Sequence, residues 1–379
     1  MAYAPGYTDR LDDVKNDWKN NFQPMSKPGV SVVICTYNGA DRLPETIRYI
    51  AGQQVPESIP WEFIIIDNAS SDNTTAIAQS EWSKYTCTQP FSIIPEPQPG
   101  LSYARARGFA SAQYDYILMC DDDNWLDPHY IAAVYEIMNA HPNIGALGGN
   151  GSLIFEEDPP AWVRSFSVYA AGRQGAKSGP VRRCTVYGAG CVIRKPAYDM
   201  LLQSGHRSLL TDRLGKELSS GGDYELCLAL AIAGFTIWYD ERLTFSHFIT
   251  RDRITVEYYR KYLKESAQCL EVLHPYKVIC DWKYQNVKIF RYRMMKSLLY
   301  LLRIYIKFLL VIPFLKKESS RYTLVSLQAY STRVMISVYI RNWNKIITNY
   351  EHGKELQQKF TRSQRMAAVQ PNSASLFPL

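Results

Sequence analysis

Three consecutive carboxylates, Asp121, Asp122 and Asp123, follow directly after the apolar residues 116–120. A run of like charges beside a core is stable only next to cationic groups or a bound cation. Carboxylate oxygens suit Mg²⁺ or Mn²⁺, which keep coordination positions open for substrate phosphates. The alternative is a solvated acidic turn that caps a helix starting near Pro128. Both readings stay open for these residues taken alone.

Other apolar runs also end in polar side chains. The three ends are Thr36-Tyr37-Asn38, Asp67 and Asp121-Asp122-Asp123. Singly, each could be an ordinary strand end or helix cap. Because the carboxyl ends of parallel strands meet at one edge of a sheet, where ligands bind, together they favour a nucleotide site. Asp67 would accept from the ribose or base, and a metal would take the phosphates.

The elements that would position these residues alternate along the chain. Residues 29–38, 61–67, 91–94 and 116–120 have strand patterns, and residues 40–52 and 102–112 have helical patterns. This alternation predicts an α/β fold with a mostly parallel central sheet flanked by helices. Neither common glycine-rich phosphate loop occurs in the chain. A metal and arginine side chains would therefore have to neutralise a diphosphate.

Charge is distributed unevenly along the 379 residues, whose net charge is +7. Residues 277–350 contain 14 Lys and Arg against 2 Asp and Glu, whereas residues 1–276 carry a net charge of −7. A basic, apolar C-terminal region suggests an anionic partner, a membrane surface before nucleic acid. The eight scattered cysteines indicate reduced thiols in a cytosolic setting, and residues 1–28 show no secretion signal.

Four segments resemble the family-two glycosyltransferases of the Rossmann-like GT-A fold. They are residues 30–39 with Thr36-Tyr37-Asn38, residues 64–74 with Asp67, Gly100 to Arg105, and Asp121-x-Asp123 followed by Pro128. The likeness covers about residues 29–255, with the segments in the family's order and spacing. It implies an inverting transferase, of hexosyltransferase type, that uses a nucleotide diphosphate sugar.

The resemblance also implies roles for the donor-side residues. Thr36, Tyr37 and Asn38 would line the nucleotide pocket, and Asp67 would contact the base or ribose. Asp121-x-Asp123 would bind Mg²⁺ or Mn²⁺, Asp122 would belong to the donor site rather than to the metal, and Arg105 would contact the donor. The chain departs from the family at Ala106, where Asn is common, and at Asn124, where Asp is common.

In the second half of the matching region, the resemblance implies residues near the acceptor. Gly188 and Gly190 resemble a glycine-containing turn beneath the acceptor, with a bulged strand as the alternative. Asp223 matches the family's catalytic base, although Gly222 stands where Glu is usual. The alternative for Asp223 is a carboxylate that only stabilises a helix N-terminus. An inverting displacement needs a carboxylate near the acceptor hydroxyl, which favours the catalytic role.

Two further side chains are candidates for ligand contact. His247, followed by Arg251 and Arg253, resembles a bacterial subgroup in which the His lies near the metal or diphosphate, and a structural hydrogen bond is the alternative. Trp162 could stack on an acceptor sugar, whereas core packing is the simpler explanation.

The basic C-terminal region is also apolar. Residues 298–315 are interrupted by Arg303 and Lys307, and each charge within a spanning helix costs about 2.5 to 3.5 kcal/mol. With Arg293 and Lys296 these cations share one side of a helix. We therefore expect a C-terminal amphipathic helical appendage that contacts the membrane surface through residues 288–347. The alternative is a helical hairpin that packs on the enzyme or in a homodimer.

Together these interpretations divide the chain into four parts: an N-terminal extension (1–28), a GT-A catalytic domain (29–275), a basic helical region (276–350) and a tail (351–379) whose end is disordered. Residues 29–128 would bind the nucleotide sugar, and residues 129–275 a glycan or lipid-linked acceptor. Without a Gln-x-x-Arg-Trp motif, we expect single additions in bacterial polysaccharide or glycolipid assembly, at the cytoplasmic face of the membrane.

Three rival readings explain less of the sequence. A sugar-nucleotide nucleotidyltransferase typically needs a glycine-rich loop, which the segment Thr36 to Gly39 lacks. A role in membrane-surface binding alone would not explain the carboxylates at the strand ends. Nucleic acid is not expected as a partner, because the chain contains no known nucleic-acid-binding motif.

Overall fold

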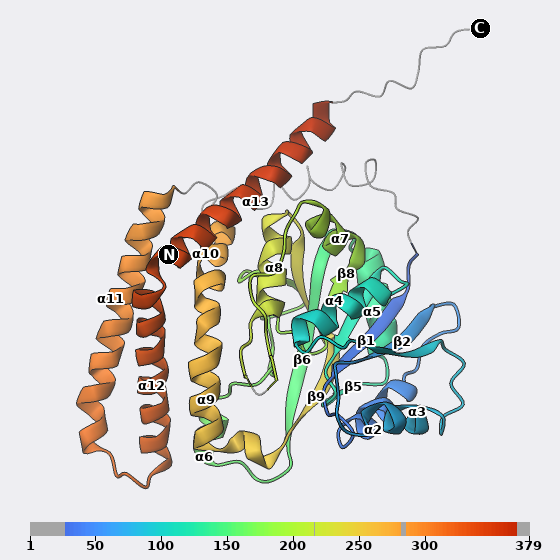
Figure 1. Ribbon diagram of the computed structural model, residues 1–379, viewed down its shortest axis with the longest axis horizontal. Helices are drawn as coiled ribbons and strands as arrows, with labels where there is room; N and C mark the ends of the chain where they lie inside the picture. The colour runs from blue at the N-terminus through green and yellow to red at the C-terminus, as the bar shows by residue number, and fades with distance from the viewer. Residues whose placement is uncertain (1–26, 216, 282–285, 370–379) are drawn as a thin grey trace.

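The computed structural model describes residues 27–215, 217–281 and 286–369. These residues form one nine-stranded sheet with the order β3-β2-β1-β4-β8-β6-β9-β5, and β7 pairs with β9. Figure 1 shows helices on both faces of the sheet and a group of long helices to one side. The expected disordered end, residues 370–379, and nearly all of the expected N-terminal extension lie outside the described residues.

The first half of the sheet is parallel; β1, β2 and β4 are buried, whereas the edge strand β3 is half-buried. Its continuous aliphatic and β-branched runs give strands with two buried faces, which a parallel sheet covered by helices requires. The strands are β1 (Val30–Thr36), β2 (Trp61–Asp67), β3 (Phe91–Pro95) and β4 (Tyr116–Cys120). The connecting helices are α2 (Leu43–Ala51), α3 (Thr74–Trp82) and α4 (Leu101–Ser111).

The second half of the sheet is mixed. β8 runs antiparallel to β4 and β6, β6 and β9 are parallel, and β5 and β7 pair antiparallel with β9. The strands are β5 (Asn124–Leu126), β6 (Ile144–Phe155), β7 (Gly179–Pro180), β8 (Val192–Arg194) and β9 (Thr236–Ile249). The helices are α5 (Tyr130–Ala140), α6 (Ala161–Ser165), α7 (Lys195–Gln203) and α8 (Gly222–Ile232).

Two apolar cores lie on opposite faces of the sheet. Val32 and Ile34 of β1 face the core shared with α2 and α5, while Val33 faces the core shared with α4 and α8. The predicted α/β fold is thereby confirmed. Residues 188–190 form a turn, as the resemblance implies, rather than the bulged strand that was the alternative: Gly190 takes a left-handed φ of 66°, and β8 begins only at Val192.

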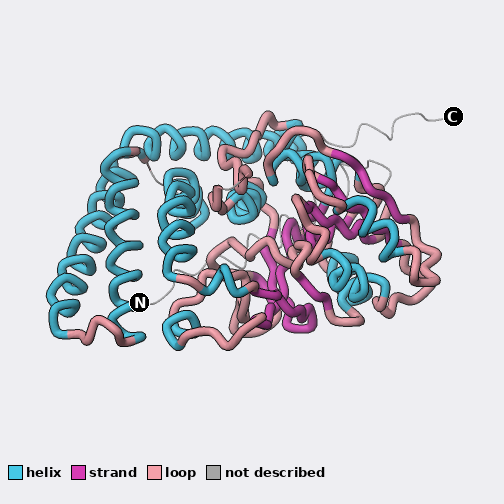
Figure 2. Tube along the Cα trace, turned by 60° about the horizontal axis from the view of Figure 1, so that its bottom comes forward, coloured by secondary structure: helices cyan, strands magenta, loops and turns pink. Residues whose placement is uncertain are grey.

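The C-terminal region is helical, as expected. Its elements are η1 (Arg251–Ile254), α9 (Val256–Ser266), η2 (Ala267–Cys269), α10 (Leu270–Asp281), α11 (Val287–Val311), η3 (Ile312–Phe314), α12 (Ser320–Arg341) and α13 (Trp343–Val369). Figures 1 and 2 show α11 and α12 side by side, with α13 crossing back toward the sheet domain. Phe290 of α11 stacks on Tyr350 of α13 with ring centroids 4.2 Å apart, which anchors the near end of α11.

Candidate active site

The ends of β1, β2 and β4 lie side by side at one edge of the sheet, beside a cavity of about 450 Å³. Nine of the residues predicted from the sequence line it: Thr36, Tyr37, Arg105, Asp121, Asp122, Asp123, Gly188, Asp223 and His247. Four do not belong to its lining: Asn38, Asp67, Gly190 and Trp162. The fold therefore brings the acidic end of β4 and the start of α8 to the walls of one cavity.

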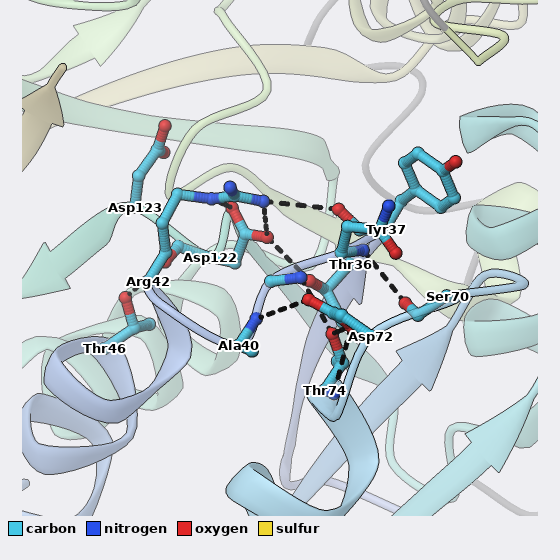
Figure 3. Close-up of polar contacts among 12 residues, drawn as sticks. Thr36, Tyr37, Ala40, Arg42, Thr46, Ser70, Asp72, Thr74, Asp122 and Asp123 are labelled. Atoms are coloured by element: carbon cyan, nitrogen blue, oxygen red, sulfur yellow. Dashed lines mark hydrogen bonds and ion pairs between the residues drawn. The ribbon is translucent and has the colours of Figure 1, made fainter. Parts of the chain in front are cut away.

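Asp122 is held by neighbouring protein groups. Its two carboxylate oxygens accept from the Arg42 guanidinium at 3.0 and 2.8 Å, and one also accepts from the Thr36 hydroxyl at 2.6 Å (Figure 3). The Thr46 hydroxyl donates to the Asp122 carbonyl at 2.8 Å. These bonds tie the end of β4 to β1 and α2, and they neutralise Asp122 before any ligand arrives.

Asp123 faces the His247 ring, which arrives from β9, and the Arg253 guanidinium, which arrives from η1. Arg253 Nη1 lies 2.8 Å from one carboxylate oxygen, and His247 Nε2 lies 3.5 Å from the other. The pairing of β5 with β9 sets His247 opposite Asn124, and His247 Nδ1 lies 3.2 Å from the Ala170 carbonyl. Burial would raise the pKa of Asp123, but His247 and Arg253 hold that pKa well below its usual range.

Asp121 also lies at the end of β4, and within the described part of the chain its carboxylate has no partner as close as those of Asp122 and Asp123. Burial raises the pKa of its carboxyl, and the neighbouring Asp123 raises that pKa further, against the opposing charges of Arg105 and His247. Two buried carboxylates of the same strand end therefore repel each other. A cation bound near both would relieve that repulsion.

Asp67 and Asn38 brace the loop after β2. Asp67 accepts from the Ser70 backbone at 3.1 Å and from the Thr75 hydroxyl at 2.6 Å. Asn38, at a φ of 48°, accepts from the Ser71 backbone at 2.8 Å. Both side chains thus have protein partners beside the cavity. The sequence did not single out Asn68, which donates to the carbonyls of residues 96 and 98 and accepts from Gly100, so that it fixes the entry to α4.

Asp223 is a half-buried residue in the first turn of α8. One oxygen accepts from the Gly188 backbone N–H at 2.6 Å, and the other accepts from the Tyr224 N–H at 2.9 Å. Burial raises its pKa to about 6, Arg105 acts to lower that pKa, and Asp212 acts to raise it. A Cβ on Gly188 would lie 3.2 Å from the Asp223 carboxylate, so the glycine lets the backbone approach closely.

The remaining acceptor-side predictions lie away from the cavity surface. The Gly190 carbonyl accepts from the Tyr130 hydroxyl at 2.6 Å, behind the Gly188 turn. Trp162 is 6% exposed and packs edge-on against Tyr259, with ring centroids 4.8 Å apart. Its placement matches the core-packing alternative, because a buried indole offers no open face for a sugar to stack on.

The structure adds cavity residues that no motif marked. Tyr169, Tyr258 and Tyr262 contribute aromatic surface from the β6 side and from α9, and Arg213 enters from the loop before α8. Asp212 also lines the cavity and forms an ion pair with Arg105. The tyrosines follow ordinary helical or loop patterns, and a lone Thr-Asp-Arg tripeptide has no recognisable signature, so the sequence offered no signal for them.

The donor set suits an ion that also takes ligands from its substrate. Within the described residues, no three His, Cys, Asp or Glu side chains converge as a metal-binding group. Mg²⁺ and Mn²⁺ do not require one, because one or two carboxylates plus substrate phosphates complete their coordination. Asp121, Asp123 and His247, which line one cavity, fit that kind of ion.

Comparisons with known proteins agree with this architecture. A model of Glycosyl transferase family 2 matches residues 31–199. The succinoglycan biosynthesis protein ExoM of Rhizobium meliloti is 24% identical over 241 residues, 63% of this chain and 73% of that protein. The cholesterol galactosyltransferase of Borreliella burgdorferi is 31% identical over 111 residues, which is 29% of each protein. The aligned segment thus spans less than a third of that relative's length.

Solved structures show a distant likeness. The mannosyltransferase PcManGT from Pyrobaculum calidifontis, in complex with GDP-Man and Mn²⁺, gives a TM-score of 0.48 at 15% identity, over 95% of this chain and 91% of that one. TarS 1–349 from S. aureus gives 0.47 at 13% identity, over 89% and 92% of the two chains. The family match runs from β1 into α7 and includes the acidic end of β4. Residues 31–199 of this chain, somewhat less than half of it, are therefore similar to Glycosyl transferase family 2.

Proposed function

We propose that this protein is an inverting glycosyltransferase that moves a sugar, of hexose type, from a nucleotide diphosphate sugar to an acceptor hydroxyl. The observation that carries the proposal is the composition of one cavity. The acidic end of β4 forms part of its wall, and Asp223, a half-buried residue whose pKa is raised to about 6, forms another part. The match of residues 31–199 to the model of Glycosyl transferase family 2 supports the same assignment.

The donor half offers the groups that a nucleotide diphosphate needs. Tyr37, at the end of β1, is 47% exposed and presents an aromatic surface beside Thr36. Asp67 and Asn38 would act from behind this surface by holding the loop after β2. We further propose that Asp67 contacts the ribose or base of the donor. Arg105 and Arg213 line the same cavity and supply positive charge where the departing diphosphate becomes more negative.

Asp121, Asp123 and His247 would hold the divalent cation, Mg²⁺ or Mn²⁺. When bound, such an ion neutralises charge on the diphosphate leaving group. We assign Asp122 to the donor site rather than to the metal, since the Arg42 guanidinium bonds to both of its oxygens and Thr36 bonds to one of them. Arg253 keeps Asp123 ionised and oriented, while the Ala170 carbonyl contacts the His247 ring.

Asp223 would act as the general base toward the acceptor hydroxyl. A carboxyl with a pKa of about 6 is ionised at neutral pH and is still a stronger base than an ordinary aspartate. The Gly188 and Tyr224 N–H groups fix its orientation, and Gly190 with Tyr130 supports the Gly188 turn. Direct attack by the activated hydroxyl, with departure of the nucleotide diphosphate from the opposite side, inverts the anomeric centre.

The biological setting is also a proposal. Relatives such as the succinoglycan biosynthesis protein suggest polysaccharide or glycolipid assembly, with single additions to a glycan or lipid-linked acceptor. We place the enzyme on the cytoplasmic face of the membrane, held by α11. By length and composition, Val287–Phe314 is the one helix in the described residues that could cross a bilayer, and one such helix is weak support for a span. Arg303 and Lys307 within it favour a surface position.

The test is a screen of the common nucleotide sugars, with and without Mn²⁺ or Mg²⁺, that measures released nucleotide diphosphate. We expect release from one or a few donors and dependence on the divalent ion. Asp223→Asn should lower transfer by at least about 100-fold, and Asp123→Ala should weaken the response to metal. Asp199→Asn, an exposed aspartate of α7, is the matched control. The proposal would be wrong if pyrophosphate were the product, or if folded Asp223→Asn kept wild-type turnover.

A further inference from the structure

Asp212 lies in the loop between α7 and α8 and joins the two halves of the active-site cavity. Its side chain is buried and its backbone takes a left-handed φ of 53°. One carboxylate oxygen accepts from the Gly222 N–H at 2.7 Å, and the other is paired with Arg105 Nη1. The Ser219 hydroxyl donates to its carbonyl. A single residue thereby contacts both the donor-side arginine of α4 and the first turn of α8.

Gly222 leaves the space that this carboxylate occupies. A Cβ at position 222 would lie 2.8 Å from Cγ of Asp212, a separation that real Cβ atoms essentially never show. Asp212 also lines the cavity. Its carboxylate fills the space that a side chain at position 222, just before Asp223, would need. The glycine in the sequence Gly222-Asp223 thus has a physical reason, namely the approach of a carboxylate from another loop.

Arg105 stands among three carboxylates, those of Asp212, Asp223 and Asp121. Within the described residues it is paired with Asp212, and no bond from it to Asp223 is formed. The ionisable groups that face Asp223 are Arg105 from α4, Asp212, Tyr224 of α8, Tyr262 of α9, Cys191 before β8 and Cys269 of η2. Arg105 is the cation in this set, so its position controls how strongly the charge of Asp223 is compensated.

We propose that Asp212 is a positioning residue that holds Arg105 on the donor side and fixes the first turn of α8, so that Asp223 stays available to the acceptor. The inference rests on the proposed role of Asp223 as the base. Without the Asp212 carboxylate, Arg105 would lose its ion-pair partner. Asp223 would then be the carboxylate on the acceptor side with which Arg105 could pair. A base paired with a guanidinium takes a proton less readily.

Asp212→Asn isolates the charge of this residue, because Asn tolerates a left-handed backbone and can still accept from the Gly222 N–H. We expect the acid limb of the kcat/KM profile to move down by about one pH unit, because a negative charge near Asp223 is lost and Arg105 is less neutralised. We also expect kcat at pH 8 to fall roughly 10- to 100-fold. Asp212→Glu should return the acid limb toward its wild-type position.

A second readout does not depend on turnover. Carboxyl ¹³C NMR titration of protein labelled at aspartate, with the Asp223 signal assigned from Asp223→Asn, follows the ionisation of Asp223 directly. We expect a lower midpoint in Asp212→Asn and an unchanged midpoint in Asp199→Asn. An inactive wild-type protein would refute the proposed function, while the NMR midpoints would still decide the role of Asp212.

Arg105→Met provides the opposite test if Asp212→Asn does not fold. Removal of the cation should move the Asp223 midpoint up, because Asp212 then remains as an uncompensated neighbour. An unchanged Asp223 titration midpoint in folded Asp212→Asn or Arg105→Met would overturn the proposal. So would an Asp212→Asn protein that melts at a lower temperature but shows no shift in the acid limb of its kcat/KM profile.

Discussion

At the scale of single residues, Asp223 gives the proposed chemistry a measurable pH dependence. The residue is half-buried, and the loss of contact with water raises the pKa of its carboxyl to about 6 from an ordinary value of 3.8. A general base works only when deprotonated, so activity is present above the raised pKa and is lost as the pH falls through it. The sign is therefore fixed: acidification inactivates the enzyme at a pH where most aspartates are still ionised.

We expect log kcat/KM to rise with a slope near one up to about pH 6 and to be level above it. The measurement is a profile of donor-dependent transfer between about pH 4.5 and 8, at constant ionic strength and saturating divalent ion. Circular dichroism at each pH serves as the control for folding. A profile that stays level down to pH 4.5 in a folded protein would exclude Asp223, as placed here, as the base.

The sequence indicated which side chains lie at the cavity, but it did not indicate which residues those side chains contact. Residues next to strand ends, such as Thr36 and Asp123, line the cavity because a strand end fixes where the next side chain lies. The partners of those residues could not be read in the same way. Arg105 and Asp212 are 107 positions apart, and only the folded chain shows that they form an ion pair. Local patterns carry no information about such distant pairs.

At the scale of elements, the docking of α4 on the sheet sets the position of Arg105. Gly108, one turn after Arg105, lets the helix approach β1 closely. A Cβ at Gly108 would lie 2.5 Å from Cγ1 of Val33 and 3.3 Å from Cγ1 of Ile66. Val33 is buried and β-branched, so its side chain has little freedom to move aside.

We expect Gly108→Ala to lower the free energy of unfolding by about 1 to 3 kcal/mol through overpacking. This loss would occur although the helix propensity of alanine is more favourable than that of glycine by about 1 kcal/mol. Activity should fall as well, because a displaced α4 carries Arg105 with it. Urea denaturation measures the first effect and the transfer assay the second. In a double-mutant cycle, Val33→Ala should reduce the cost of Gly108→Ala. Strictly additive effects would show that the two side chains do not clash.

Element boundaries were predictable where one local pattern dominated. The strand at residues 61–67 matches β2 because an unbroken aliphatic run allows few alternatives. The C-terminal helices were harder to delimit, since apolar and basic residues alternate throughout. α11 begins at Val287, close to the start of the region expected to be helical, but that region divides near its end, at Asn342, into α12 and α13. Their division depends on packing: α13 turns back, and Lys359 donates to the Ser204 carbonyl beyond α7 at 3.1 Å.

At the scale of the whole molecule, an acidic sheet domain carries a basic pair of long helices. The first half of α11 is anchored, since Phe290 and Met294 are buried. Farther along, Leu299, Ile306 and Leu310 are 53%, 54% and 66% exposed, and Phe314 is 88% exposed. Arg303 and Lys307 are exposed on the same stretch. Exposed apolar area together with cationic charge complements an anionic lipid surface.

We therefore expect the full chain to sediment with vesicles that contain phosphatidylserine, and to be released by salt because the attraction is partly electrostatic. Replacing Arg303 and Lys307 by Glu should weaken binding by at least roughly 30-fold, since each basic residue near such a surface contributes about 1 kcal/mol. Arg164→Glu with Arg173→Glu makes the same charge change on the sheet domain and should leave binding near the wild-type level. If the wild-type protein ignored these vesicles at low salt, and the α11 variant instead dissociated a dimer, α11 would be a contact between two copies of the chain.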